Sequence, residues 1–133
     1  MKVFIEKSAN IPYVKSGTVT WIYPYPYGYI IDTKSADDAE LDCFVITDKI
    51  LQENSVVECH PIGLMEQFED DLEDHNILAV LEWEEAELTE EIKQKLVKFI
   101  TNTPDYRPVS RVIKVGKFYG KKEAEELIRR SLI

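Results

Sequence analysis

The apolar positions along the chain follow two different periods, and the period changes near Thr89. Before that point, short runs rich in β-branched and aromatic residues alternate with turn residues, a pattern typical of strands. After it, Ile92, Leu96, Val97 and Ile100 recur at helical spacing. Many strands followed by two helices favour an α+β fold, with a small antiparallel barrel or a strongly curled sheet covered by helices.

Capping residues and prolines indicate where these elements begin and end. Thr89 is a good N-cap with glutamates in the first turn, so a helix is expected to start there and to end before Pro104. A second amphipathic helix is expected over Glu123–Leu132. Pro61 is expected to end the strand Ser55–His60. The expected strands are Lys2–Glu6, Thr18–Ile22, Tyr29–Ile31, Cys43–Thr47, Ser55–His60, Ile77–Leu81 and Arg111–Val115.

An aromatic segment rich in proline precedes the first acidic segment. Pro24 and Pro26 lack amide donors and hold the preceding tyrosines in extended conformations. Core packing is the default interpretation of the tyrosines at 23, 25 and 27. Tyr27 is nevertheless the one best placed to present its hydroxyl to a ligand, because Gly28 after it allows another part of the backbone to approach closely.

Two acidic segments border apolar strands. The first holds Asp37, Asp38, Glu40 and Asp42, and the second is a predicted loop over Glu66–Asp74. Carboxylates beside a buried strand repel one another and lose hydration, and a hard divalent cation with oxygen ligands compensates them. If the strands that follow are neighbours, both segments open at one end of the sheet. Such a site suits Mg²⁺ or Mn²⁺ and fits zinc poorly, while simple solvation is the alternative.

Composition narrows the possible partners. The 133 residues are expected to form one domain with its own core. Sixteen basic against 25 acidic residues give a net charge of -9, which argues against a nucleic-acid partner. A small phosphate ligand remains compatible with this charge if metal ions supply positive charge.

The remaining residue types point to ordinary roles. Cys43 and Cys59 have no CxxC spacing and are expected to be buried free thiols in a reducing compartment. His60 and His75 are isolated, so structural roles are favoured over metal ligation. No apolar run approaches the ~20 residues of a membrane span, so a cytoplasmic protein is expected.

Several segments, in this order, resemble the soluble family I inorganic pyrophosphatases. The family pattern D-G-D-P-x-D follows a Y-G-[YF]-[IV] strand, and P-[IV]-G and D-x-G-x-x-D come later with a lysine soon after. The matching segments are VFIEKSAN (Val3–Asn10), YPYPYGYI (Tyr23–Ile30), DDAELD (Asp37–Asp42) followed by CFVI, CHPIGLM (Cys59–Met65) and EDHNILAV (Glu73–Val80). Order and relative position agree over most of the chain.

The resemblance implies a fold and an activity. The fold is a five-stranded OB-like antiparallel β-barrel with two C-terminal flanking helices. The activity is Mg²⁺-dependent hydrolysis of inorganic diphosphate, or of a related small phosphoanhydride. In such chemistry the metals lower the pKa of a bound water and neutralise charge on the leaving phosphate. Homo-oligomers are common in the family.

The resemblance also assigns residues. Glu6 matches the family's N-terminal glutamate near the substrate, and Tyr27 matches a tyrosine hydrogen-bonded near substrate phosphate. Glu69 stands where the family has another aspartate, an acidic replacement that can still bind metal. The metal ligands implied are Asp37, Asp42, Asp74 and Glu69.

The first departure from the family pattern concerns activation of the attacking water. Ala39 replaces the central aspartate of D-G-D-P-x-D, and only Asp38 or Glu40 beside it can stand in. The expected catalytic residues are therefore Asp42, Asp38 and Glu40.

The other departures concern phosphate binding. The segment between Asn10 and Tyr23 is too short for the family's usual cationic hairpin, which leaves Lys15 as the cation there. The lysine after the last metal aspartate becomes Asn76. The late Tyr-Lys pair has no aligned copy, and the nearby Tyr106-Arg107 is the expected substitute because an arginine fork suits phosphate.

These departures keep a second hypothesis open. It is a catalytically weak or inactive pyrophosphatase-like domain that binds metal or phosphate, or serves assembly. Loss of a carboxylate and of several phosphate-binding cations lowers activity by orders of magnitude when each contributes a few kcal/mol. A third hypothesis, an acidic interaction module unrelated to phosphate, leaves the retained aspartates and Tyr27 unexplained.

Overall fold

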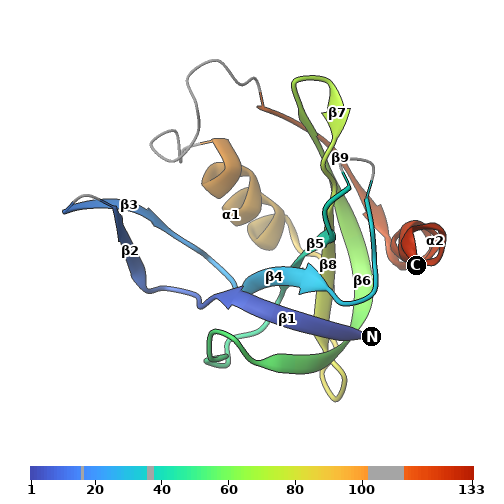
Figure 1. The fold of residues 1–133 in the computed structure, drawn as a ribbon, viewed down its shortest axis with the longest axis horizontal. Coiled ribbons are helices and arrows are strands. Elements are labelled where there is room, and N and C mark those ends of the chain that lie inside the picture. Colours follow the sequence, from blue (N-terminus) through green and yellow to red (C-terminus); the bar gives the residue numbers. More distant parts are fainter. Residues whose placement is uncertain (16, 36–37, 102–112) are drawn as a thin grey trace.

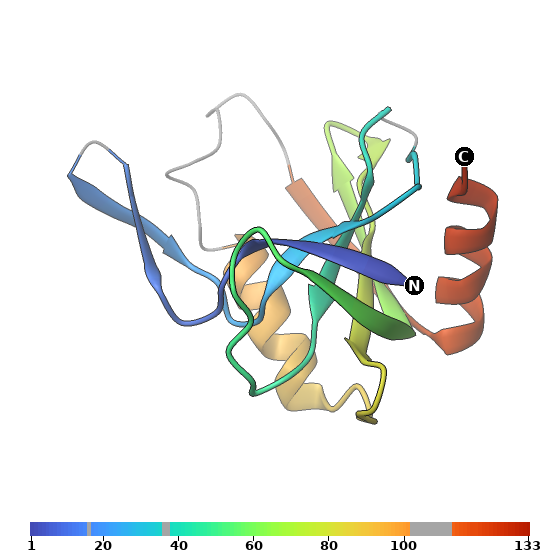
Figure 2. The same cartoon turned by 60° about the horizontal axis from the view of Figure 1, so that its bottom comes forward.

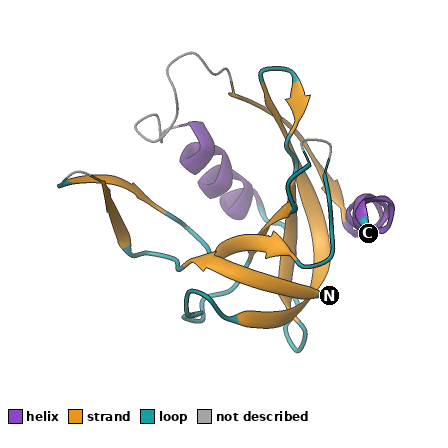
Figure 3. Cartoon of the chain, viewed as in Figure 1, coloured by secondary structure: helices purple, strands orange, loops and turns teal. Residues whose placement is uncertain are grey.

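A computed structural model describes residues 1–15, 17–35, 38–101 and 113–133 (Figure 1). Strands occupy most of the described N-terminal part and the two helices come late, as Figure 3 shows by colour. The strands are β1 (Lys2–Lys7), β2 (Pro12–Lys15), β3 (Thr18–Ile22), β4 (Tyr27–Ile30), β5 (Leu41–Val45), β6 (Val56–Glu69), β7 (Leu72–Glu73), β8 (Asn76–Leu81) and β9 (Ile113–Gly120). The helices are α1 (Glu90–Thr101) and α2 (Lys121–Ser131).

Five strands form a closed set of pairings. They follow the order β1-β4-β5-β8-β6, and β1 also pairs with β6. β6 continues beyond this set to pair with β7 and β9, so the sheet has seven strands and is not a plain barrel. The hairpin β2–β3 projects from the body (Figure 1). The expected α+β class and OB-like core are confirmed.

One pairing of the core differs from the expected antiparallel barrel. β5 and β8 run parallel, with Asp42 opposite Asn76 and Val45 opposite Ala79. The physical reason is the chain between them, because the long β6 and its hairpin return the chain to the same end of the sheet before β8 begins. The two acidic segments therefore precede neighbouring strands.

The strand break expected at Pro61 is wrong. β6 runs for 14 residues through this proline, from Val56 to Glu69. The register with β8 shifts between Pro61 and Gly63, and on the opposite edge β6 pairs with β1 before this point and with β9 after it. A bulge at this changeover tolerates a residue that cannot donate to the ladder.

The core has two parts, on the two faces of the sheet. Alternate residues of each strand point to opposite faces. Figure 2 shows α1 and α2 on different sides of the strands. The part that includes residues of α2 contains Ile5, Cys43, Ile77, Ala79 and Leu127, among others. The part that includes residues of α1 contains Phe44, Met65, Leu78, Leu96 and Phe99, among others.

Gly28 provides the close backbone approach expected from the sequence. It lies opposite Ile5 in the β1–β4 pair. A Cβ added at Gly28 would lie 1.7 Å from the backbone oxygen of Phe4. Any larger residue would therefore separate the strand that carries Tyr27 from β1.

The segment Glu66–Asp74, expected to be an open loop, is instead mostly a hairpin. Its first part is the end of β6, and Glu69 pairs with Leu72 of β7. Asp70 and Asp71 form the two-residue turn with φ of 51° and 66°. Two left-handed residues match the twist of a tight hairpin, and aspartate tolerates this conformation better than most residues.

Candidate active site

The first feature of the candidate site is the edge of the sheet where β5 and β8 begin. Because these strands are parallel neighbours, the segments before them open at the same edge. This confirms the expectation that both acidic segments lie at one end of the sheet. Asp42 of β5 and Asp74, two residues before β8, are brought together there from 32 residues apart.

The hydroxyl of Tyr27 lies near the carboxylates of Asp42 and Asp74. Burial raises its pKa well above the usual 10.0, and the charges of Asp42, Tyr23 and Asp74 and a hydrogen bond to Asp42 raise it further. The ring packs between Tyr23 and Phe44, at centroid distances of 5.3 and 4.9 Å. This packing directs the hydroxyl to the edge where both carboxylates lie.

The neighbouring tyrosines take the core role that was the default interpretation. Tyr23 and Tyr25 are buried, and Tyr23 packs on Phe99 of α1 at 4.6 Å between ring centroids. The structure places Tyr27 beside Asp42, as expected from its position before Gly28.

Sequence reasoning missed two amide residues at this edge. Gln67 Nε2 donates to Asp74 Oδ2 at 3.3 Å, and Asn76 Nδ2 donates to Gln67 Oε1 at 2.7 Å. Both side chains are buried. The signal that could have found Gln67 is strand alternation, since it shares a face with Met65, a core residue, and a buried amide needs hydrogen-bond partners.

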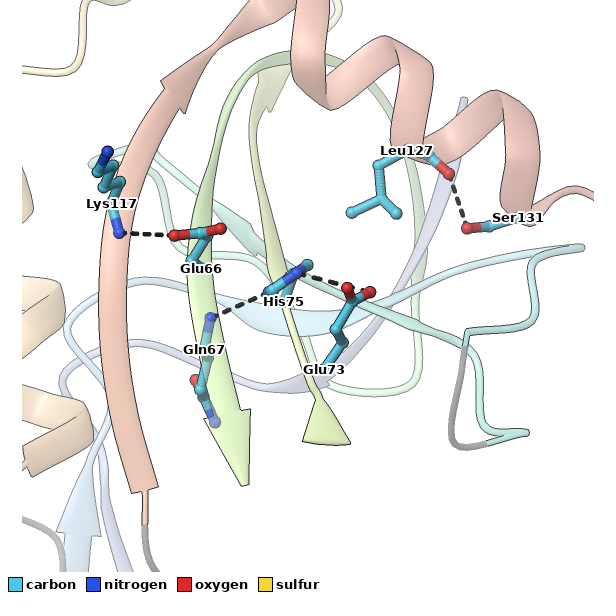
Figure 4. Close-up of polar contacts among 7 residues, drawn as sticks. All are labelled: Glu66, Gln67, Glu73, His75, Lys117, Leu127 and Ser131. Carbon is cyan, nitrogen blue, oxygen red and sulfur yellow. Dashed lines mark hydrogen bonds and ion pairs between the residues drawn. The ribbon is translucent and has the colours of Figure 1, made fainter. Parts of the chain in front are cut away.

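The opposite face of the same segment has a structural role. His75 Nδ1 accepts a hydrogen bond from the backbone N–H of Gln67 at 3.1 Å, and its Nε2 lies 3.7 Å from Glu73 (Figure 4). Its ring packs edge-on against Phe68, at 5.2 Å between centroids. These contacts agree with the structural role favoured for His75.

The two candidates for activating the water lie in different surroundings. Glu40 is close enough to Glu6 that its charge raises the pKa of Glu6, after the larger effect of burial, while Lys7 lowers it. Asp38 is highly exposed and forms an ion pair with Lys34 at 3.4 Å. The structure thus groups Glu40 with Glu6 and Asp38 with Lys34, and both Glu40 and Asp38 are exposed.

The remaining predicted site residues are placed only in part. Glu69 ends β6 on the strand face of Gln67, beside the hairpin turn. Only the backbone of Lys15, at the end of β2, is described. Asp37, Tyr106 and Arg107 lie outside the described residues.

The chemistry of the described donors suits a hard divalent cation. Carboxylate and amide oxygens from Asp42, Asp74 and Asn76 are oxygen ligands of the kind that Mg²⁺ takes. Within residues 1–15, 17–35, 38–101 and 113–133, no three His, Cys, Asp or Glu side chains are grouped closely enough to hold a metal ion.

Comparison with known proteins settles the family. The family model described as inorganic pyrophosphatase matches residues 1–132. The chain belongs to this family. The recognition made from the sequence is confirmed, and so are the expected enzyme class and the hydrolysis of inorganic diphosphate. Family I pyrophosphatases are metal-dependent enzymes, which fits the oxygen-rich edge of the sheet.

Individual relatives agree with this assignment. The inorganic pyrophosphatase of Nanoarchaeum equitans is 34% identical over 119 residues, covering 82% of this chain and 74% of the relative. The inorganic pyrophosphatase of Buchnera aphidicola is 30% identical over 120 residues, covering 83% and 68% of the two chains. The crystal structure of the Thermus thermophilus inorganic pyrophosphatase matches the fold with a TM-score of 0.85 at 21% identity, covering 98% of this chain and 87% of that one.

The two helices of this pyrophosphatase, α1 and α2, have 12 and 11 residues. Among the described residues, no helix combines the length and the apolar character needed to cross a bilayer.

Proposed function

We propose that this pyrophosphatase hydrolyses inorganic diphosphate to two phosphates with Mg²⁺ held at the edge where β5 and β8 begin. The observation that carries this proposal is the hydroxyl of Tyr27, which is hydrogen-bonded to Asp42 and whose pKa is raised first by burial and then by charges that include those of Asp42 and Asp74. Two carboxylates from distant segments acting on one hydroxyl need a compensating positive charge. A bound cation supplies that charge. The metal ligands in this proposal are Asp37, Asp42, Asp74 and Glu69.

Individual residues of the chain are assigned the remaining roles in the reaction. When bound, Mg²⁺ makes a water more acidic and offsets the charge of the phosphates. Burial and the hydrogen bond to Asp42 keep the hydroxyl of Tyr27 protonated. Because that hydroxyl has a single proton, it would donate to a phosphate oxygen only by giving up its bond to Asp42. Glu40, beside Glu6, is the better placed candidate to accept the proton of the attacking water, since Asp38 pairs with Lys34.

We assign phosphate binding to the cations and donors that the resemblance to the family indicates. Lys15 at the end of β2, with Tyr106 and Arg107, would hold the phosphate oxygens, because ammonium and guanidinium groups form charge-assisted hydrogen bonds with phosphate. Glu6 would position water or substrate beside Glu40.

The test compares the wild-type protein with two variants that make the same chemical change. Asp42→Asn removes a proposed ligand, and Asp48→Asn removes an exposed carboxylate in the turn after β5. With diphosphate and Mg²⁺, phosphate release by Asp42→Asn should fall by roughly 10²–10³-fold while Asp48→Asn keeps the wild-type rate. Equal rates for wild type and Asp42→Asn would exclude catalysis at this site. Repeating the assay with Mn²⁺ tests the choice of metal.

Three wider expectations are proposals of the same kind. Residues 1–133 are proposed to act as one domain, supported by a family match over residues 1–132. A cytoplasmic location is supported by the free, buried thiols of Cys43 and Cys59. Assembly into a homo-oligomer stays a prediction, which the molecular mass in solution tests.

A further inference from the structure

The ladder between β6 and the strands that follow it is interrupted opposite Gln67. Phe68 pairs with Glu73 of β7, and Met65 pairs with Asn76 of β8, but Asp74 and His75 belong to neither strand. The interruption therefore includes Asp74, a proposed metal ligand. Regular strand pairing does not hold this residue.

Gln67 spans the interruption with four hydrogen bonds. Its backbone oxygen accepts from the N–H of Asp74 at 2.8 Å, and its own N–H donates to His75 Nδ1 at 3.1 Å. Its side chain donates to Asp74 Oδ2 at 3.3 Å and accepts from Asn76 Nδ2 at 2.7 Å. Figure 4 shows the backbone contact with His75 on the face that α2 covers. One residue thus fixes three consecutive residues from both faces of the sheet.

The carboxylate of Asp74 determines the orientation of both amides. An ionised carboxylate only accepts hydrogen bonds, so Nε2 of Gln67 must face it. Oε1 of Gln67 then faces Asn76, whose Nδ2 must donate. This order leaves Asn76 Oδ1 as an acceptor on the residue opposite Asp42 in the parallel register. Either amide turned over would place two like groups against each other.

Burial makes this arrangement costly to change. Gln67 is 5% exposed and Asn76 is 3% exposed, so neither amide can exchange its partner for bulk water. A buried polar group that loses its partner keeps the full cost of its desolvation. The pair is therefore more rigid than two surface amides would be.

We propose that Gln67 is a positioning residue for the metal site, because its buried amide orients the carboxylate of Asp74. This inference rests on the proposed function for the metal and for Asp74 as its ligand. Hydrogen bonds that orient a ligand from behind change metal affinity by roughly 10–100-fold in other sites. Gln67 does not need to touch metal or substrate for this effect.

The experiment is a double-mutant cycle on Mg²⁺ affinity, measured by calorimetry without diphosphate. Gln67→Met keeps the length of the side chain and removes both amide hydrogen bonds. It should raise the Kd for Mg²⁺ by roughly 10-fold in the wild-type background. In the Asp74→Asn background the same change should leave the Kd within about two-fold, since Gln67 acts through that carboxylate. Gln94→Met, the same change on the exposed face of α1, should leave the Kd at the wild-type value.

The cycle separates positioning from a merely structural role. A general loosening of the fold would weaken Mg²⁺ binding equally in the wild-type and Asp74→Asn backgrounds, and such additivity would overturn the inference. A wild-type Kd in Gln67→Met would overturn it too. If Gln67→Met does not fold, the whole cycle is repeated in the Asn76→Leu background, where Gln67→Met leaves no buried amide without a partner and Asn76 is absent from every arm.

The outcome also distinguishes this inference from the proposed function. If the wild-type protein binds Mg²⁺ and the cycle shows coupling but no phosphate is released, Gln67 positions the site and the proposed catalysis is wrong. If Asp42→Asn abolishes phosphate release but the cycle is additive, catalysis stands and the role of Gln67 is wrong. No binding of Mg²⁺ by the wild-type protein overturns both.

Discussion

Asp42 lies opposite Asn76 across the parallel pair of β5 and β8. The resemblance to the family leads one to expect a lysine at the second position, and a neutral, buried amide stands there instead. The carboxylate of Asp42 consequently has a polar but uncharged neighbour on that side. Positive charge at this edge must come from other groups, which makes the stability of the edge sensitive to metal.

A carboxylate at position 76 should make the fold depend on metal. Asn76→Asp places a buried negative charge beside the half-buried Asp42 and removes the donor to Gln67 Oε1. We expect a loss of about 2–3 kcal/mol in the free energy of unfolding in EDTA, with part of it recovered in Mg²⁺. Urea unfolding in both conditions measures this. Asn54→Asp, in an exposed turn, is the matched control, and an equal loss in the two variants would contradict the prediction.

Tyr27 should make the stability depend on alkaline pH. Burial and the neighbouring carboxylates raise its pKa well above 10.0, so the folded chain keeps the proton at a pH where the unfolded chain releases it. The stability due to the protonated hydroxyl is fully present below about pH 10 and is lost as the pH rises toward the folded pKa. Between pH 9 and pH 11 the free energy of unfolding should fall more steeply for wild type than for Tyr27→Phe. Parallel curves would show that Tyr27 titrates normally.

Gly28, on the strand that carries Tyr27, should not tolerate a side chain. The Cβ of Gly28→Ala would lie 1.7 Å from the oxygen of Phe4, so β1 and β4 must separate. We expect a loss of about 3 kcal/mol in thermal or urea unfolding. Gly17→Ala is the control, because its Cβ would meet nothing within 4 Å and its φ of 81° alone costs about 1 kcal/mol. Similar losses in both would contradict the steric explanation.

Gly120 offers a stabilising change at the start of α2. It has extended N-cap geometry, with φ of -86° and ψ of -170°, and no side-chain cap. Gly120→Ser would cap the helix and form a capping box with Glu123, raising the free energy of unfolding by about 0.5 kcal/mol. Gly120→Ala shares the loss of chain flexibility without the hydroxyl, so the serine variant should have the higher Tm. The reverse order would show that the cap does not form.

Features that depend on neighbouring residues, such as helix caps and apolar strands, could be predicted from the sequence. Thr89 caps α1 as expected, with its hydroxyl accepting from the N–H of Ile92 at 3.3 Å, and β8 coincides with the apolar run after His75. Gly28 allows the close approach inferred from its place between tyrosines. The position of Asp42 beside a buried strand already indicated a carboxylate that needs compensation.

Features that depend on pairing between distant strands could not be predicted from local signals. Pro61 reads as a strand break, yet it lies where β6 changes partner from β1 to β9, and no residue near it reveals that change. The acidic run hides a hairpin because two aspartates, rather than Asn-Gly, take the left-handed turn. Gln67 looks like one more polar residue in that run until its partners are known.

The parallel pair of β5 and β8 has a consequence for folding. Asp42 and Asp74 are far apart in the chain and meet only after β6 has turned back and β8 has docked beside β5. Joining such distant segments is slow, because the long loop between them must close first. If both carboxylates hold a metal ion, as proposed, that ion would not guide the early collapse of this chain. It would act after the pair has formed, slowing the separation of the two strands and so the rate of unfolding.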